Sequence, residues 1–356
     1  MLNLNSFFPA SIPLPNVRNA VQRSWKKLST ASVSSLPPPP AAAVPCGTNV
    51  HPAAAAAPEA AATSIDPSWG VTLTMNKKEL VAELEKLGMR PGRGLGQNFL
   101  LDGNLLDWIV RAAGVSAGEQ ILEVGPGFGA LTSRLLAAGA ELTAVEYDHR
   151  LADYNREKFA SFPNFHLVEA DACRVDYDEL FPAGTVYRSV ANLPYAISSV
   201  FIAKLLECAN QPKTMFFMLQ KEMGERLAAR SGTKAYGALS VRVQLDYEVK
   251  IEKIVPPEVF CPPPEVESAL VSFTLREEKL CRDDEKKLVS RVVRTAFNQR
   301  RKQLGKVLGQ MFGKAEVETA FARLNIPMEI RPDKLEVADF VAIARELNLI
   351  KGDSDK

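Results

Sequence analysis

The feature that most constrains the fold of this chain is a glycine loop set between an apolar run and a helical pattern. Residues 120–124 predict a short buried strand, the next five (125–129) include three glycines, and helical spacing begins at Ala130. A strand that turns sharply into a helix needs glycine, because the loop adopts unusual dihedrals and a ligand approaches its backbone closely. The unit predicts an α/β fold with a doubly wound, Rossmann-like sheet.

Acidic side chains follow the ends of the next two predicted strands. The strand at 141–145 leads to Glu146, and the strand at 165–169 leads to Asp171. The carboxyl ends of parallel strands meet at one edge of a sheet, where ligands bind. We therefore expect Glu146 to accept the hydroxyls of a ribose and Asp171 to accept an adenine amine. The glycine loop alone does not identify the ligand, since nicotinamide and flavin enzymes use similar loops.

A third polar group, Asn192-Leu193-Pro194-Tyr195, follows the strand predicted at 186–190. At a sheet edge it would gather a carboxamide, a main-chain carbonyl and an aromatic face, a set that suits a flat base with an exocyclic amine. The same four residues are also an ordinary exit from a strand into a turn. Their position after the glycine loop and the two acids favours the functional interpretation.

Composition limits the class of protein. With 356 residues and 46% hydrophobic content, the chain can bury a sizeable core. It has no run of 18 apolar residues that would predict a membrane span. The five cysteines show no C-x-x-C spacing and there are three histidines, which argues for a reducing compartment and against a zinc site. We expect no metal and, by default, a monomer.

The first 74 residues are rich in Ala, Pro and Ser and contain no acid before Glu59, which predicts disorder. Their basic character allows a transit peptide for a plastid or mitochondrion. Alternatively, Met75 begins the conventional protein, because helical periodicity opens there with a helix predicted near residues 80–87. We favour the second interpretation and a cytoplasmic protein.

The Gly- and Arg-rich stretch at 90–102 resembles a basic lid over a ligand, or a plain linker.

The C-terminal part carries the clearest signal for a polyanion. Nine Lys or Arg and no acid lie between Lys286 and Lys314. Helical periodicity there places apolar residues on one face and basic residues on the other. The predicted organisation is a disordered extension (1–74), a sheet domain (75–275) and a helical domain (276–356) that grips structured RNA. Residues 230–240 predict a mobile loop near the substrate.

Six motifs resemble, in order, those of the small-subunit ribosomal RNA adenine N6,N6-dimethyltransferases, which use S-adenosylmethionine. The similarity covers nearly all of residues 90–310. The motifs stand at Gly96–Leu100, Glu123–Gly127, Asn192–Tyr195, Tyr236–Val241, Phe260–Pro264 and Ala296–Lys302.

The resemblance implies a methyltransferase that converts adjacent adenosines near the 3′ end of small-subunit rRNA to N6,N6-dimethyladenosine, within the pre-small-subunit particle, during ribosome biogenesis. It implies donor contacts from Asn98, Leu100, Gly125, Gly127, Glu146, Asp171 and Asn192. The residues expected around the target base are Asn192, Leu193, Pro194, Tyr195 and Phe260. Those expected to bind RNA are Arg93, Arg294, Arg300, Arg301 and Lys302. Where the family usually has Lys after Pro264, this chain has Glu265, so one RNA contact is missing or comes from a neighbour.

An adenine amine is a poor nucleophile, because its lone pair is delocalised into the ring. We expect the Asn192 oxygen and the Leu193 or Pro194 carbonyl to accept its two N–H bonds, while Tyr195 stacks on the base. Phe260 either stacks on the opposite side or is a plain core residue. The competing functions are a large-subunit rRNA adenine methyltransferase and a non-catalytic RNA-binding assembly or transcription factor. A nicotinamide dehydrogenase is disfavoured by Asp171 and the Asn192 motif.

Overall fold

The computed structural model describes residues 75–89 and 98–354, all within a compact unit that spans residues 61–356. The predicted disordered extension and most of the predicted basic lid, including Arg93, lie outside the described residues. Among the described residues, no helix is long and apolar enough to cross a bilayer.

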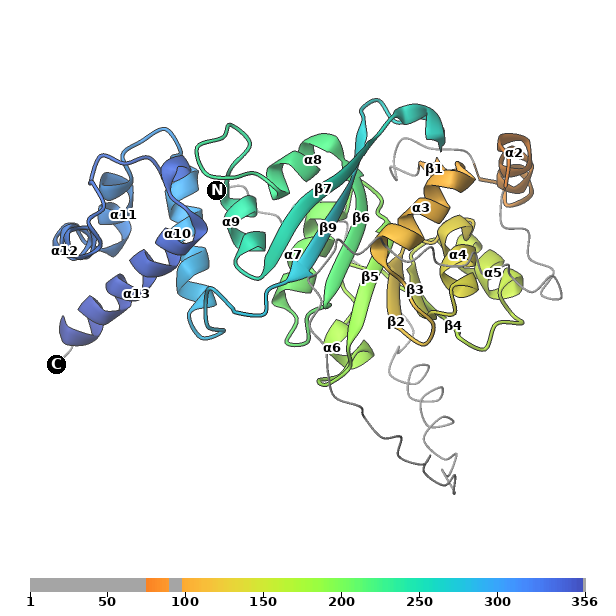
Figure 1. Ribbon diagram of the computed structural model, residues 1–356, viewed down its shortest axis with the longest axis horizontal. Helices are drawn as coiled ribbons and strands as arrows, with labels where there is room; N and C mark the ends of the chain where they lie inside the picture. The colour runs from red at the N-terminus through yellow and green to blue at the C-terminus, as the bar shows by residue number, and fades with distance from the viewer. Residues whose placement is uncertain (1–74, 90–97, 355–356) are drawn as a thin grey trace, which may run out of the picture. The chain divides into compact units, whose positions relative to one another are not determined.

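The core of the fold is a seven-stranded sheet with the order β4-β3-β2-β5-β6-β9-β7 (Figure 1). Neighbours among the first five strands are parallel, and β9 is antiparallel to β6 and β7. The strands are β2 (Gln120–Val124), β3 (Glu141–Glu146), β4 (Phe165–Glu169), β5 (Tyr187–Asn192), β6 (Thr214–Gln220), β7 (Tyr247–Val255) and β9 (Ser268–Leu275). The predicted α/β class is confirmed, and β5 extends two residues further than expected, to Asn192.

Helices cover both faces of this sheet. They are α3 (Gly103–Ala113), α4 (Ala130–Ala137), α5 (His149–Lys158), α6 (Tyr177–Leu180), α7 (Ser198–Glu207), α8 (Lys221–Leu227) and α9 (Ala238–Gln244). Alternate residues of one strand point to opposite faces. Phe216 of β6 accordingly joins a cluster with α3 and α4, whereas Phe217 joins the cluster that contains α6 and α7. Such two-sided burial explains why the central strands read as continuous apolar runs.

A short helix precedes the sheet, as the sequence predicts. Helix α2 (Lys77–Lys86) begins at Asn76, whose side chain accepts hydrogen bonds from the first turn, while the Glu79 carboxylate accepts one from the Asn76 N–H. Leu80 and Leu84 are buried in a small hydrophobic cluster with Phe128. This cluster places α2 beside the glycine loop.

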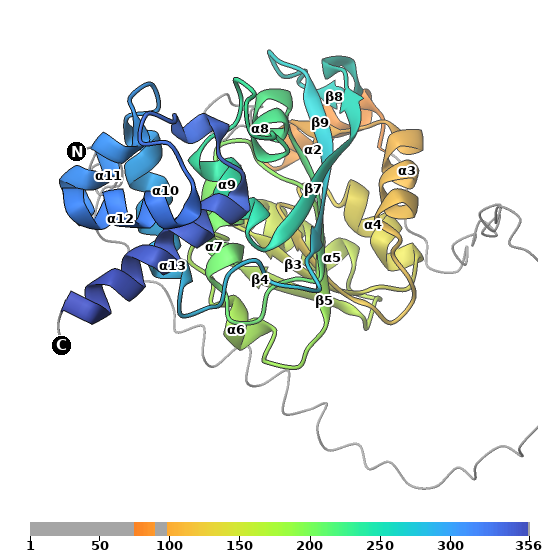
Figure 2. The same cartoon turned by 60° about the vertical axis from the view of Figure 1, so that its left-hand side comes forward.

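The C-terminal part is helical, comprising α10 (Lys286–Asn298), α11 (Leu304–Phe312), α12 (Lys314–Leu324) and α13 (Val337–Ser354). On α10, Val289 and Val292 are buried while Arg291 and Arg294 are exposed, which confirms the predicted two-faced helix. The hydrophobic cluster of these helices also includes Val241 from α9. Helices α9 and α10 lie side by side in both views (Figures 1 and 2).

The stretch at 230–240 differs from the loop that the sequence predicts. Ala238–Ser240 is the first turn of α9, and Tyr236 is fully buried in the C-terminal cluster. The Arg300 guanidinium donates hydrogen bonds to the carbonyls of Lys234 (2.7 Å) and Thr233 (3.0 Å). A segment held by a buried ring and a guanidinium is an ordered connection to the helical part.

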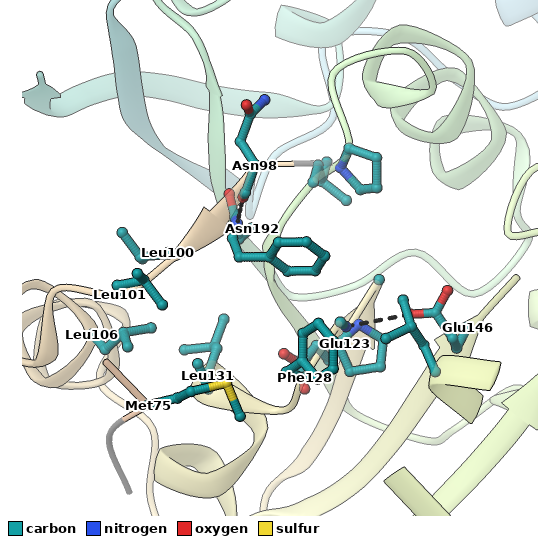
Figure 3. A pocket seen from close by; sticks show the side chains of 18 of the residues that line it. Met75, Asn98, Leu100, Leu101, Leu106, Glu123, Phe128, Leu131, Glu146 and Asn192 are labelled. Atoms are coloured by element: carbon teal, nitrogen blue, oxygen red, sulfur yellow. Dashed lines mark hydrogen bonds between the residues drawn. The ribbon is translucent and has the colours of Figure 1, made fainter. Parts of the chain in front are cut away.

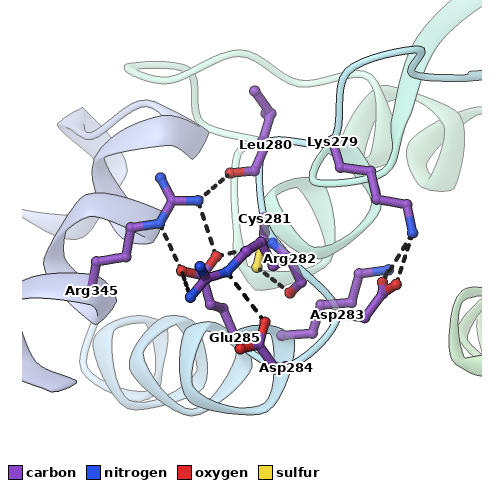
Figure 4. Close-up of polar contacts among 9 residues, drawn as sticks. Lys279, Leu280, Cys281, Arg282, Asp283, Asp284, Glu285 and Arg345 are labelled. Carbon is purple, nitrogen blue, oxygen red and sulfur yellow. Dashed lines mark hydrogen bonds and ion pairs between the residues drawn. The ribbon is translucent and has the colours of Figure 1, made fainter.

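An ion-pair network joins α13 to the start of α10 (Figure 4). The Arg345 guanidinium donates from Nε and Nη2 to the two carboxylate oxygens of Glu285, at 2.9 and 3.0 Å. Glu285 also accepts a hydrogen bond from the Arg282 N–H. These contacts, led by Arg345, lower the pKa of Glu285 from its ordinary value of 4.5 to about 2.

We therefore expect Glu285 to confer acid sensitivity. Because its folded-state pKa is depressed, its stabilisation is complete above pH 4.5 and is lost as the pH falls towards 2. Glu285→Gln should lower the free energy of unfolding by about 1 kcal/mol at pH 7 and have a smaller effect near pH 2.5. Urea unfolding across this pH range would measure both values, with the exposed Glu329→Gln as control. Equal destabilisation at both pH values would contradict the assignment.

Candidate active site

A cavity lies at the carboxyl edge of the sheet, between the ends of β2 and β5 (Figure 3). It draws residues from the strand ends, from the glycine loop and from β1 (Phe99–Leu100), a short strand paired with β8 (Phe260–Cys261). The predicted residues that line it are Asn98, Leu100, Gly125, Gly127, Glu146, Asn192, Leu193, Pro194 and Tyr195. The structure thus brings most of the predicted donor and base residues around one space.

The glycine loop forms a cradle of bare main chain. Gly125 and Gly127 have φ values of +69° and +58°, a region that L side chains rarely adopt. A Cβ on Gly125 would lie 3.2 Å from the Pro194 ring, and one on Gly127 would lie 3.2 Å from the Phe99 ring. A side chain at either position would press on one of these rings, so the loop can pack this closely only with glycine. Its bare main chain lines the cavity and suits a ligand laid against the backbone.

Glu146 lies at the end of β3, 5% exposed, and its carboxylate is oriented by main-chain donors. Its Oε1 accepts hydrogen bonds from the N–H groups of Tyr147 (2.8 Å) and Asp148 (3.0 Å), and its Oε2 accepts one from Gly127 (3.3 Å). Burial raises the pKa of Glu146, and these three bonds oppose the rise. A carboxylate anchored in this way beside the cradle is suited to accept the hydroxyls of a ribose, the role predicted for it.

Two residues of α5 support the cradle, and one of them, Lys158, also lines the cavity. Asn155 is fully buried and its Nδ2 donates to the Gly127 carbonyl at 2.7 Å. Lys158 donates from Nζ to the Phe128 carbonyl at 2.9 Å, and burial lowers the pKa of its ammonium to about 8. The sequence analysis missed both, because single polar residues on a helix usually mark its solvent face. Only their three-residue separation, nearly one helical turn, hints that they share a face.

Glu123 on β2 is a second buried carboxyl group at the cavity. It is 2% exposed and accepts a hydrogen bond from the Thr132 hydroxyl at 2.7 Å. Burial raises its pKa to about 8, and the nearby Glu146 adds to the rise. Glu123 is therefore protonated at neutral pH.

The Asn192 carboxamide is oriented by the segment that enters β1. Its Nδ2 donates a hydrogen bond to the Asn98 carbonyl at 3.1 Å (Figure 3). A carbonyl only accepts, so the bond fixes which side-chain atom is nitrogen and leaves Oδ1 as the acceptor of this side chain. The Pro194 carbonyl already accepts from the Ile197 N–H and the Ser198 hydroxyl, each at 3.1 Å. Of the two carbonyls that the sequence left open, that of Leu193 is therefore favoured.

Two predicted residues do not line the cavity. Asp171 follows β4, where its Oδ1 accepts from the Cys173 N–H (2.9 Å) and its Oδ2 pairs with Arg174 (3.4 Å). Phe260 is 4% exposed and packs in the hydrophobic cluster with α3 and α4. The geometry favours the core role that the sequence had left open for Phe260.

The residues predicted to bind RNA have two different surroundings. Arg294, Arg301 and Lys302 are exposed on α10 and in the turn after it. Arg300 instead holds the two loop carbonyls described above, a role that the sequence did not suggest. Glu265, at the position where a Lys was expected, is exposed in the turn before β9. Among the described residues, no group of three His, Cys, Asp or Glu side chains is arranged to hold a metal ion.

The sheet, the glycine cradle and the Asn192 motif together define a Rossmann-like methyltransferase. A model of one such family, described as ribosomal RNA adenine dimethylase, matches residues 91–349, and the chain belongs to this family.

Individual relatives support this assignment. The chain is 42% identical over 254 residues to ribosomal RNA small subunit methyltransferase A of Pseudomonas fluorescens, covering 71% of this chain and 91% of the relative. It is 35% identical over 273 residues to the protein of the same name from Clostridium acetobutylicum, covering 76% and 98%. Among solved structures, a dimethyladenosine transferase from Plasmodium falciparum matches with a TM-score of 0.60 and 25% identity, covering 70% of this chain and 98% of that one. The 23S rRNA methyltransferase ErmE matches in fold, with a TM-score of 0.56, 24% identity, and coverage of 70% and 100%.

We expect the raised pKa of Glu123 to appear in the pH dependence of stability. Between pH 4.5 and 8 the folded chain keeps a proton that the unfolded chain releases, so stability falls as the pH rises through this window. Glu123→Gln keeps an acceptor for Thr132 and should show a smaller decline in Tm between pH 5 and 8. Differential scanning calorimetry would measure the decline, with Glu141→Gln as control. Parallel profiles for wild type and Glu123→Gln would show that Glu123 is ionised in the folded protein.

Proposed function

We propose that this family member transfers methyl groups from S-adenosylmethionine to the N6 atoms of adjacent adenosines near the 3′ end of small-subunit rRNA. The carrying observation is that the anchored Asn192 carboxamide, the glycine cradle and Glu146 share one cavity. Membership of the rRNA adenine dimethylase family and the names of the curated relatives support the enzyme class and the RNA. We further propose that the protein acts as a monomer on the pre-small-subunit particle.

The cavity fits the proposed methyl donor. Gly125 and Gly127 would let it approach the main chain, Glu146 would accept its ribose hydroxyls, and Asn98 and Leu100 would lie at its methionine end. Asp171 stays a predicted contact for the donor adenine, next to the strand that carries Glu146. When bound, S-adenosylmethionine supplies a methyl group on a positively charged sulfur. The chain must then present the acceptor nitrogen with its lone pair free.

The Asn192 motif would hold the acceptor nitrogen in that orientation. The Asn192 Oδ1 and the Leu193 carbonyl would accept the two N–H bonds of the adenine amine, which favours a pyramidal nitrogen over a planar one. Nitrogen would gain positive charge as its bond to the methyl carbon forms and the carbon–sulfur bond breaks, and fixed oxygen dipoles would stabilise that charge without moving. The donor would leave as a neutral thioether, and the methylated nitrogen would release one proton to water. Tyr195, on the same turn, would hold the base by its face. Catalysis in this scheme consists of positioning and electrostatics, and needs no ionised base.

Phosphate contacts on the basic surface of the helical part would offset the free-energy cost of unstacking the target adenine. An adenine must leave its stack to enter the cavity, at a cost of a few kcal/mol. Exposed Arg294, Arg301 and Lys302 lie on or just after α10, where phosphate contacts can offset this cost. We expect binding to weaken steeply with salt because each phosphate contact releases counterions.

The decisive test is methyl transfer to unmethylated small-subunit particles with labelled S-adenosylmethionine. Asn192→Ala should reduce the rate at least about 100-fold, the usual effect of losing one group that stabilises developing charge. Donor affinity, measured by calorimetry, should change much less, because the cradle and Glu146 remain. Asn164→Ala is the matched control, since Asn164 donates its amide to the Ala140 carbonyl away from the cavity.

Other outcomes would point to the competing functions. If large-subunit particles are offered in a parallel reaction, label in their rRNA alone would favour a large-subunit methyltransferase. Tight RNA binding without any transfer would favour a non-catalytic assembly or transcription factor. Full activity of Asn192→Ala would contradict the proposed mechanism.

We propose that the protein is located in the cytoplasm. Mass spectrometry of the native N terminus would show whether residues 1–74 are present, and would distinguish this location from import into an organelle.

A further inference from the structure

The outer end of the Tyr195 side chain is held by a residue that lies outside the cavity. The Tyr195 hydroxyl and the Ser268 Oγ are 2.5 Å apart, although 73 positions separate them in the chain. Tyr195 lines the cavity, whereas Ser268 is fully buried and does not line it. The bond therefore runs from the cavity wall into the sheet.

Ser268 is a rigid anchor. It begins β9 and is paired in register with Gln220 of β6 and Val255 of β7. The residue before it, Glu267, accepts a hydrogen bond at its carbonyl from the Lys221 N–H (2.9 Å) and forms an ion pair with the Lys221 ammonium (2.7 Å). Strands on both sides and a fixed neighbour leave the Ser268 hydroxyl little freedom to move.

The inner end of Tyr195 is equally fixed. Leu193, two residues before it, is 1% exposed, and the Pro194 carbonyl is bonded to the start of α7. Between this backbone and the hydroxyl, two side-chain torsions set the position of the ring. A ring anchored at both ends keeps its centre in one place beside the Asn192 carboxamide.

Either hydroxyl of the Tyr195–Ser268 pair can donate to the other. Burial raises the pKa of the Tyr195 hydroxyl, and the bond to Ser268 opposes this only in part. The phenol is therefore protonated at neutral pH and able to donate. Loss of the Ser268 oxygen would leave a half-buried hydroxyl to find another partner, and the ring would shift with it.

We propose that Ser268 is a positioning residue for the target base, holding the Tyr195 ring at the angle at which an extruded adenine stacks on it. The inference rests on the proposed function, and it assigns to β9 a part in substrate recognition. Ser268 itself touches neither the base nor the donor.

Ser268→Ala and Tyr195→Phe both remove the bond and keep the ring. Each should lower kcat/KM for unmethylated small-subunit particles about three- to tenfold, the effect expected of one hydrogen bond. The double variant should lose no more than either single variant, because both remove the same interaction. Donor affinity should be unchanged in all three. Losses that multiply in the double variant would overturn the proposal.

A readout independent of activity uses a synthetic RNA of the small-subunit 3′ end with 2-aminopurine at the target position. Stacking on Tyr195 should quench its fluorescence in the wild-type complex, and Ser268→Ala should restore at least half of the lost signal. Ser272→Ala is the matched control, because Ser272 lies on the same strand and donates to the Glu252 carboxylate at 2.7 Å. This control should quench like the wild type.

These outcomes distinguish the role of Ser268 from the proposed function of the protein. A lower Tm for Ser268→Ala with wild-type quenching and wild-type kcat/KM would show a purely structural serine and overturn the proposal. A wild-type protein that transfers no methyl group would overturn the proposed function, and the fluorescence comparison would still decide the role of Ser268.

Discussion

The parallel pairing of β2 with β5 is the interaction on which the site depends. The two strands run side by side from Gln120 and Tyr187, and β3 and β4 continue the sheet on one side while β6 continues it on the other. Ligands of open α/β sheets bind where the strand order reverses in this way. The same pairing sets Gly125 against Pro194, so closely that a Cβ would nearly touch the ring. The glycine cradle and the Asn192 turn are thus adjacent because two strands are adjacent.

Two acids in the cavity wall, Glu123 and Glu146, differ in the hydrogen bonds that stabilise their ionised forms. Glu123 and Glu146 both line the cavity, but main-chain N–H groups stabilise only Glu146 as an anion. Glu123 accepts a hydrogen bond from the Thr132 hydroxyl, but burial outweighs this contact and raises its pKa to about 8. Glu123 therefore keeps its proton at neutral pH. Two carboxylates side by side would repel each other, and protonation of one removes that cost. The Glu146 charge is then free to serve a ligand.

Much of the sheet is predictable from sequence, because strands buried on both faces leave unbroken apolar runs. Residues 120–124 of β2 were predicted to the residue for this reason. The supports of the site escaped prediction, since Asn155 and Lys158 sit on a helix of polar composition and act through distant partners. Tyr236 and Arg300 show the same limit: a loop-like sequence became ordered through contacts with α10, far along the chain. The predicted roles of the site residues await the experiments above, whereas the convergence of most of the predicted donor and base residues on one cavity is a property of the fold.

The bond from Asn192 to the Asn98 carbonyl has a consequence for control of the reaction. The carboxamide that would bind the acceptor amine takes its orientation from a peptide group 94 positions earlier, in the segment that leads into β1. The angle of the acceptor oxygen is therefore tied to the position of the Asn98 peptide group, and a protein in which that group is displaced would hold the oxygen at the wrong angle even with every strand of the sheet intact. One hydrogen bond thus couples the residue before β1 to the turn at the end of β5.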